Sequence, residues 1–490
     1  MSGCSKLLND DILREIAFYA SRPTCLSLMR TCKFLHSEGA KAALRHPVAL
    51  THYMGMFRFL HFLHAGDGFR YVRELRICFV TTDLAGLSEL EDSIRLMTGL
   101  EALLFDVDPE KDDYAEDMLG YFPPLVDAIS RIPHLRRISI KGAGPCAKEL
   151  MRRLQSNSVE SVLLDWDFGR HWARGRPPFV GSDPWPSLHP VPFLAKWTST
   201  LQELTCEHWY NSRVLPVFPH VYPHMRRLTI RNDCRYPRLA PLIRAYPNLA
   251  YLNVNTFGDT AYHLPDPEAE AARAVNVSSQ HAADALGPWR RLEEIVGPIV
   301  ELYALGLQAP VGLLRVPKFG IGDRNLDYFS TVFRDLQPRG IQFAAEGELF
   351  LPRFVELVRG PGASFLENID LRVHLHRDQA DKDLAAVLDD LGSGLARLPL
   401  RRLHIRLVAN ELRPPSHTQA PLLTGELHTP LTPAERSLDE FDVDAYVRRL
   451  ASAVHSLTEA VVEIQDLRQR STGLRQSNKC GNFRRVVGSG

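Results

Sequence analysis

The chain has 490 residues, of which 45% are hydrophobic and 24% charged, a composition typical of globular proteins. Lysine plus arginine and aspartate plus glutamate both number 58, and this balance argues against nucleic acid or an anionic membrane as a general partner. The N-terminus MSGCSKLLNDDIL has no apolar signal core, no apolar run reaches the roughly 18 residues of a membrane span, and the eight cysteines form no CxxC pair. These features predict a cytoplasmic or nuclear protein with reduced thiols and no membrane partner.

Residues 1–48 predict a small helical domain. A first helix runs up to Tyr19 with apolar residues at helical spacing, and Asn9 or Asp10 can cap it. Pro23 is expected to break this helix. A second helix is predicted to carry Leu26, Leu28, Met29, Cys32 and Leu35, and a third to carry Ala42, Ala43 and Leu44 before Pro47.

This segment resembles an F-box, whose first helix reads L-P-x-E-I-L-x-x-I and whose second is leucine-rich with a Cys and a basic–aromatic pair. Here Leu8-Asn9-Asp10-Asp11-Ile12-Leu13 and Ile16 are followed by Cys32-Lys33-Phe34-Leu35, with Asn9 in the place of the family's Pro and Asp11 in that of its Glu. The resemblance covers about 40 of the 490 residues. It implies docking on a Skp-type adaptor through Leu8, Asn9, Ile12, Leu13, Ile16, Leu28 and Leu35. A plain helical cap over the end of a repeat array is the alternative, and the sequence does not separate adaptor contacts from the cap's own core.

Residues 49–71 predict a linking helix, with Met54, Phe57 and Leu60 at helical spacing. From residue 72 to 467 the frame L-x-x-L-x-L recurs, from Val72–Leu75–Ile77 to Leu400–Leu403–Ile405. The last two apolar residues of each copy lie two apart, which is the period of a strand with one buried face. The other copies begin at residues 100, 135, 159, 201, 225, 249 and 366, and Val461–Gln465 is a further candidate strand.

Segments with helical spacing lie between these strands, and several end near a Pro that favours extended backbone before the next strand. The predicted helices cover residues 87–97, 118–132, 147–155, 239–246, 351–358 and 383–398. Leu204, Leu228 and Leu252 are each 24 residues apart, within the range of leucine-rich repeats.

The frame resembles a leucine-rich-repeat solenoid of the irregular kind, although the Asn that follows each standard frame is replaced, for example by Val80 and Asp108. The expected fold class is therefore α/β: a helical F-box, then a leucine-rich-repeat-like solenoid of short parallel strands alternating with helices. An ordinary α/β domain with parallel strands is the alternative.

Two inserts interrupt the repeats, at residues 168–193 and 412–437. The first is rich in Pro and aromatic residues, and long loops often carry binding while Trp and Arg anchor interfaces. A plain surface loop is its alternative. The candidate substrate-binding residues are Trp172, Arg174, Arg176, Trp185 and Trp209.

The second insert is expected to be disordered, with Ser437 and Glu440 then opening a helix to about His455. The tail at 468–490 is basic, with five Arg and one Lys, and is also expected to be disordered. RNA binding is the alternative role for this tail.

No catalytic signature occurs in a suitable context. Cys206, His208, His220 and His224 vaguely match a zinc spacing, but Pro219 and Pro223 keep the His pair off one helix face. We therefore expect no enzyme activity, no metal and no cofactor.

The combined resemblance implies a substrate-recognition adaptor of an SCF-type cullin–RING ubiquitin ligase, which reaches the cullin and RING subunits through the Skp-type adaptor and binds an unidentified protein substrate. A leucine-rich-repeat scaffold with no link to ubiquitination is the alternative.

Overall fold

The computed structural model describes residues 9–78, 84–106, 119, 122–166, 189–207, 219–231, 236–255, 266–282, 289, 292–319, 323–345, 360–412, 431–468 and 476–485. The chain forms two compact units, Met1–Cys234 and Arg235–Gly490. Each unit alternates strands and helices, so the α/β class is confirmed.

The first unit begins with three helices, α1 (Asp10–Tyr19), α2 (Arg22–Leu28) and α3 (Lys33–Arg45). The predicted second helix through Leu35 is wrong, because α2 ends at Leu28. The Thr31 hydroxyl donates to the Leu28 carbonyl at 2.7 Å, a local bond that competes with helix continuation. Pro23 occupies the first turn of α2, where its missing N–H costs nothing, so it starts this helix.

Within the predicted linking helix at 49–71 the structure has the helix α4 (Tyr53–Gly66), followed by a short 3₁₀ turn η1 (Phe69–Tyr71). The strand β1 (Val48–Leu50) was not predicted. It pairs in parallel with β2 (Glu74–Ile77), and Val48 and Leu50 are buried. The sheet therefore begins at the predicted boundary between the F-box-like domain and the linking helix. Three residues that alternate between buried and exposed are enough to form this first strand.

Parallel strands follow one another in chain order through the first unit. They are β3 (Ala102–Phe105), β4 (Arg137–Ile140), β5 (Ser161–Asp165), β6 (Glu203–Glu207) and β7 (Arg227–Arg231). The helices between them are α5 (Leu84–Leu96), α7 (Pro123–Ser130), α8 (Pro145–Arg153) and α11 (Pro190–Phe193), with η2 (Ala195–Trp197) before β6. The middle apolar residue of each frame pairs with that of the next, and Leu75, Leu204 and Leu228 are at most 1% exposed. The strand interpretation of the frame is thus confirmed.

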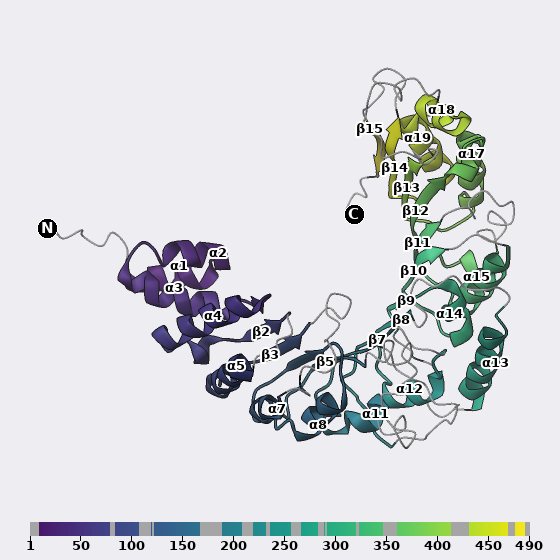
Figure 1. The fold of residues 1–490 in the computed structure, drawn as a ribbon. Helices are drawn as coiled ribbons and strands as arrows, with labels where there is room; N and C mark the ends of the chain where they lie inside the picture. The colour runs from purple at the N-terminus through teal and green to yellow at the C-terminus, as the bar shows by residue number, and fades with distance from the viewer. Residues whose placement is uncertain are drawn as a thin grey trace, which may run out of the picture. The chain divides into compact units, whose positions relative to one another are not determined.

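The second unit continues the pattern with β8 (Tyr251–Asn255), β9 (Glu294–Val296), β10 (Leu313–Phe319), β11 (Gly340–Ala345), β12 (Asn368–His376), β13 (Arg402–Glu411) and β14 (Glu459–Arg468). These strands are parallel, and helices cover one face of them (Figure 1). The helices are α12 (Leu239–Ala245), α13 (Pro267–Ala282), α14 (Ile299–Leu305), α15 (Asp323–Leu336), α17 (Leu384–Leu395), α18 (Pro433–Glu440) and α19 (Val443–Ala453), with 3₁₀ turns η4 (Pro361–Ala363) and η5 (Arg377–Gln379). Strands β9, β10 and β11 were not predicted, and the predicted helix 351–358 lies outside the described residues.

Two expectations near the C-terminus are wrong. The capping box is formed by Thr432 and Glu435 at the start of α18, and Asp442 caps a separate helix α19, so order resumes before the predicted end of the insert at Ser437. Within the supposedly disordered tail, β15 (Gln476–Arg484) pairs antiparallel with β14. Its polar sequence carries little strand signal, but the edge of β14 offers it a row of backbone partners.

Backbone hydrogen bonds join the starts of successive described strands. The Arg73 carbonyl accepts from the N–H groups of Glu101 at 2.8 Å and Ala102 at 2.9 Å. Most later strands also begin with two N–H groups that donate to one carbonyl. For example, the N–H groups of Arg401 and Arg402 donate to the Glu367 carbonyl at 2.7 and 3.0 Å. We call this series of carbonyls, each of which accepts from two N–H groups of the next repeat, the carbonyl staircase. It holds successive strands in register through the backbone alone. Among the described residues, no helix is long and apolar enough to cross a membrane.

Candidate docking surface of the N-terminal helices

The three N-terminal helices enclose a small core of their own. Ala17, Cys25, Leu35, Ala42 and Ala43 are buried in it, and Leu13 and Leu28 pack against it. Leu35 is only 4% exposed. Of the seven predicted adaptor-binding residues, Leu13, Leu28 and Leu35 therefore serve mainly the fold of the cap.

Ile12 and Ile16 instead face outward, with 49% and 43% of their surface exposed. Tyr19, three residues after Ile16, continues the same helix face and is 80% exposed. Leu26 on the neighbouring helix α2 is 47% exposed. We call these four residues, Ile12, Ile16, Tyr19 and Leu26, the apolar stripe.

Asn9 has a structural role at the start of α1. Its side-chain oxygen accepts from the Asp11 N–H at 3.2 Å, so it caps the helix as the sequence predicts. Asp10 and Asp11 lie in the first turn, where the helix dipole favours negative charge. The remaining predicted residue, Leu8, lies outside the described residues.

Ion pairs hold α1 against α3 behind the stripe. Arg14 contacts Asp11 at 2.8 Å and Glu38 at 3.3 Å, and Glu38 also pairs with Lys41 at 2.6 Å. The hydrogen bond from Lys41 lowers the pKa of Glu38. One turn further along the same face of α1, the Arg45 guanidinium lies 4.6 Å from the Phe18 ring centroid.

The buried Cys25 fastens α2 to α1. Its thiol donates to the Ala17 carbonyl at 3.3 Å, and burial raises the pKa of this thiol. His46, beyond the end of α3, lies 3.1 Å from the Ala20 carbonyl, and Arg22 donates to the Pro47 carbonyl at 2.9 Å. The stripe is thus presented by helices that are tied together by their own contacts.

The candidate substrate residues of the first insert cannot be placed, because Trp172, Arg174, Arg176, Trp185 and Trp209 all lie outside the described residues. A hollow of about 380 Å³ lies at the strand starts of the first unit. Its walls carry charged groups that already pair with one another, including Arg73 with Glu101 at 3.4 Å and Arg136 with Glu160 at 2.6 Å. These pairs leave the hollow without a strong preference for either sign of charge.

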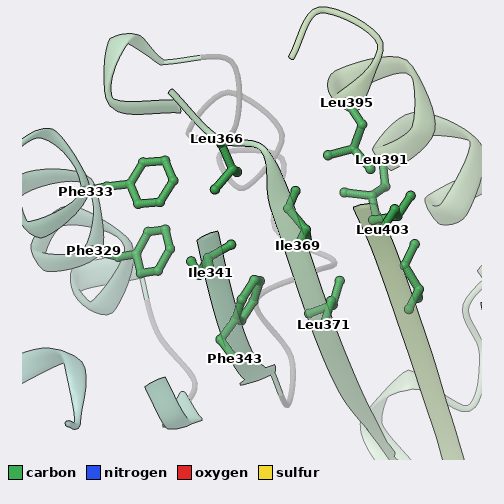
Figure 2. A pocket seen from close by; sticks show the side chains of 11 residues that line it. Phe329, Phe333, Ile341, Phe343, Leu366, Ile369, Leu371, Leu391, Leu395 and Leu403 are labelled. Atoms are coloured by element: carbon green, nitrogen blue, oxygen red, sulfur yellow. The ribbon is translucent and has the colours of Figure 1, made fainter. Parts of the chain in front are cut away.

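A second, much smaller cavity of about 20 Å³ lies between strands β11 to β13 and helices α15 and α17 (Figure 2). Its lining is wholly apolar, with Phe329 and Phe333 on one side and Leu391 and Leu395 on the other. A space of this size holds about one water, and an apolar one offers that water no partners. It is a gap in core packing with no group able to do chemistry.

Tyrosines and carboxylates gather on the helices of the second unit. The Tyr303 hydroxyl donates to Glu270 at 2.6 Å, and the ring stacks on Tyr328 at 4.1 Å between centroids. Burial raises the pKa of Tyr303, which keeps it a neutral donor. Arg273 closes this cluster through Asp335, so it joins α13, α14 and α15. Within the described ranges, no group of three His, Cys, Asp or Glu side chains could hold a metal ion.

Tyr19 and Leu26 are the residues of the apolar stripe that the sequence alone did not single out. The spacing of Tyr19 from Ile16 was a usable signal, whereas Leu26 belongs to another helix and its exposure depends on how that helix packs. In comparisons with known proteins, no family model matches the chain and no curated protein is significantly similar to it.

Proposed function

We propose that this chain is the substrate-recognition adaptor of an SCF-type cullin–RING ubiquitin ligase. In this proposal the apolar stripe docks a Skp-type adaptor, which connects the chain to the cullin and RING subunits, and the repeats hold a protein substrate. The chain performs no bond chemistry. It raises the local concentration of the substrate near a ubiquitin-charged enzyme.

The observation that carries the proposal is an exposed apolar face on helices whose own core is complete. Among the described residues eleven large hydrophobic side chains are exposed, and five of them belong to α1 and α2. Fully burying a side chain such as Ile contributes roughly 1.5–3 kcal/mol, so such a face favours a partner. Its position before an array of repeats matches the order of F-box and repeat segments that the sequence resembles.

An interaction scaffold outside any ligase is the second candidate. Asn9 in the place of the F-box Pro favours it. The two candidates differ in one partner, because only the ligase adaptor must bind a Skp-type protein.

The test is Ile16→Asp, which places a charge in the middle of the stripe without touching the core of the cap. A matched control is Val275→Asp on α13, since Val275 is 39% exposed on a helix of the second unit. We expect the unmodified chain and the control to co-purify with a Skp-type adaptor and cullin. Ile16→Asp should weaken binding of the purified adaptor by about 100-fold or more, because burying an unpaired carboxylate costs several kcal/mol.

Circular dichroism of each variant verifies that the fold is retained. If the unmodified chain fails to bind the adaptor at micromolar concentration, the ligase proposal is wrong. If Ile16→Asp binds as tightly as the control, the stripe is not the docking surface.

A further inference from the structure

The strands of the second unit have one face that the described helices leave uncovered (Figure 1). On β11 to β14 this open face carries two rows of side chains set by the strand register. One row is Gln342, Asp370, His404 and Val461, and the next is Ala344, Arg372, Arg406 and Glu463. The inward residues between them, such as Leu371 and Ile405, are buried.

The acidic groups in these rows are engaged by their neighbours. Asp370 accepts from the Gln342 amide at 3.0 Å and lies 3.5 Å from His404. Glu463 accepts from Arg406 at 3.0 Å and from Gln465 at 3.0 Å, and it lies 3.7 Å from His404. The hydrogen bond from Arg406 is the main cause of the lowered pKa of Glu463.

Arg372 differs from these groups. It is exposed, and within the described part of the chain no hydrogen bond or ion pair of its side chain is present. Its partner in the register on β13 is Arg406, on a strand that lies roughly 4.8 Å away. The Arg406 guanidinium is bound by Glu463 of β14, so Arg372 is the guanidinium of this row without a carboxylate among the described residues. On the β11 side its partner is Ala344, whose small side chain leaves room above the sheet.

The open face of the first unit shows what a matched arrangement looks like. There Arg137 pairs with Glu74 at 3.5 Å and Arg231 with Glu207 at 3.3 Å, and Arg76 pairs with Asp106. Each of these arginines meets a carboxylate on another strand of the sheet or directly after one. Arg231 and Arg372 both follow the last apolar residue of their frames, but among the described residues Arg372 has no such carboxylate.

We propose that Arg372 is an anchor for an acidic side chain, a carboxylate or a phosphate group, on a protein segment that crosses β11 to β13. Guanidinium binds either anion through two parallel hydrogen bonds. A nucleic acid fits this face poorly, because Asp370 and Glu463 flank the arginines and a polyanion needs several unopposed cations. The inference uses the proposed function only in giving the repeats a protein partner.

The test is an array of nine-residue peptides with neutral flanks, in which each sequence occurs with Asp, Glu, phosphoserine or Asn at the centre. We expect the full chain to retain a subset of the acidic versions over their Asn counterparts, and the carboxylate and phosphate versions separate the two sources of the anion. Arg372→Ala should weaken the retained peptides about tenfold or more. Arg448→Ala, on the exposed face of α19, is the matched control and should change nothing.

A second variant supplies the anion within the chain. Ala344→Glu places a carboxylate opposite Arg372, so it should abolish the preference for acidic peptides without lowering the melting temperature. The proposal is overturned if no peptide shows an acid preference, if that preference survives in Arg372→Ala and Ala344→Glu, or if a single-stranded RNA of matched length binds more tightly than every peptide. Ile16→Asp should leave the peptide binding unchanged, so a failure of the ligase proposal is distinguishable from a failure of this one.

Discussion

Breaking the largely buried ion pair of Arg273 and Asp335 should cost the second unit a large part of its folding free energy. The two side chains are only 14% and 10% exposed, and Arg273 also donates to the Tyr303 carbonyl at 3.0 Å. Its guanidinium lies 4.7 Å from the Tyr303 ring centroid. Arg273→Ala removes all three contacts and leaves the Asp335 carboxylate buried.

Breaking a buried pair by removing one partner costs about 3 kcal/mol or more, most of it from the stranded charge. Arg334 lies 3.5 Å from Asp335, but its side chain is 65% exposed and recovers little of this energy. We therefore expect Arg273→Ala to lower the free energy of unfolding of the second unit by about 3 kcal/mol. The double variant with Asp335→Ala should cost clearly less than the sum of the two single changes.

The measurement is urea unfolding followed by hydrogen exchange of peptides from α13, α14 and α15, which reports on this unit by itself. The control is the exposed pair of Arg449 and Asp389, 2.8 Å apart with side chains 61% and 57% exposed, whose loss should cost at most about 1 kcal/mol. The reasoning is refuted if Arg273→Ala costs no more than this control, or if its cost adds fully to that of Asp335→Ala.

Three further outcomes follow from single side chains. Leu35→Ala should destabilise the N-terminal helices by about 3 kcal/mol, because it opens a cavity in their core, whereas Ile12→Ala should cost less than about 1 kcal/mol; thermal unfolding and hydrogen exchange of α1 to α3 distinguish the two. His189 accepts from the Val191 N–H at 3.3 Å, and burial lowers the pKa of His189 to about 4. Because the folded pKa of His189 lies below the unfolded value of about 6.5, the contribution of His189 to stability is complete above pH 6.5 and is lost as the pH falls towards 4. His189→Asn should therefore flatten this part of a curve of stability against pH. An unchanged slope would contradict the argument. Lys479→Met should speed hydrogen exchange of β15 and lower the free energy of unfolding by about 1–2 kcal/mol, because the Lys479 ammonium group donates to the carbonyls that end α18. Unchanged exchange would show that β15 is held by its pairing with β14 alone.

The frame L-x-x-L-x-L was sufficient to place nine strands because it records burial directly. Leu228 and Ile230 are buried while Arg227 in the same frame is exposed, as the spacing predicts. The frame weakened where one of its positions changed. In β9 its third position is Gly297 and in β11 its first is Pro338, so neither strand was predicted. In β10 it survives as Val311–Leu314–Val316 and could have been found.

The N-terminal helices show the limit of periodicity. Ile12, Leu13 and Ile16 all fit one amphipathic helix, yet Leu13 packs on the core while its two neighbours lie in the stripe. The difference depends on where α2 and α3 stand around α1. That placement follows from the turn at Met29 to Cys32 and from the thiol bond of Cys25, which no spacing rule contains.

By itself, the sequence determined the elements that repeat, since apolar residues at strand and helix spacing must find a common core wherever they occur. It also determined where α1 starts, because the Asn9 side chain caps its own backbone. Only the tertiary structure decided which residues meet across strands. The placing of Arg372 beside Arg406 and the carbonyl staircase both depend on register between segments that are 20 or more residues apart. The pairing of the polar β15 depends on the free edge of β14. Such contacts carry no local signal, because each partner's sequence is compatible with many others.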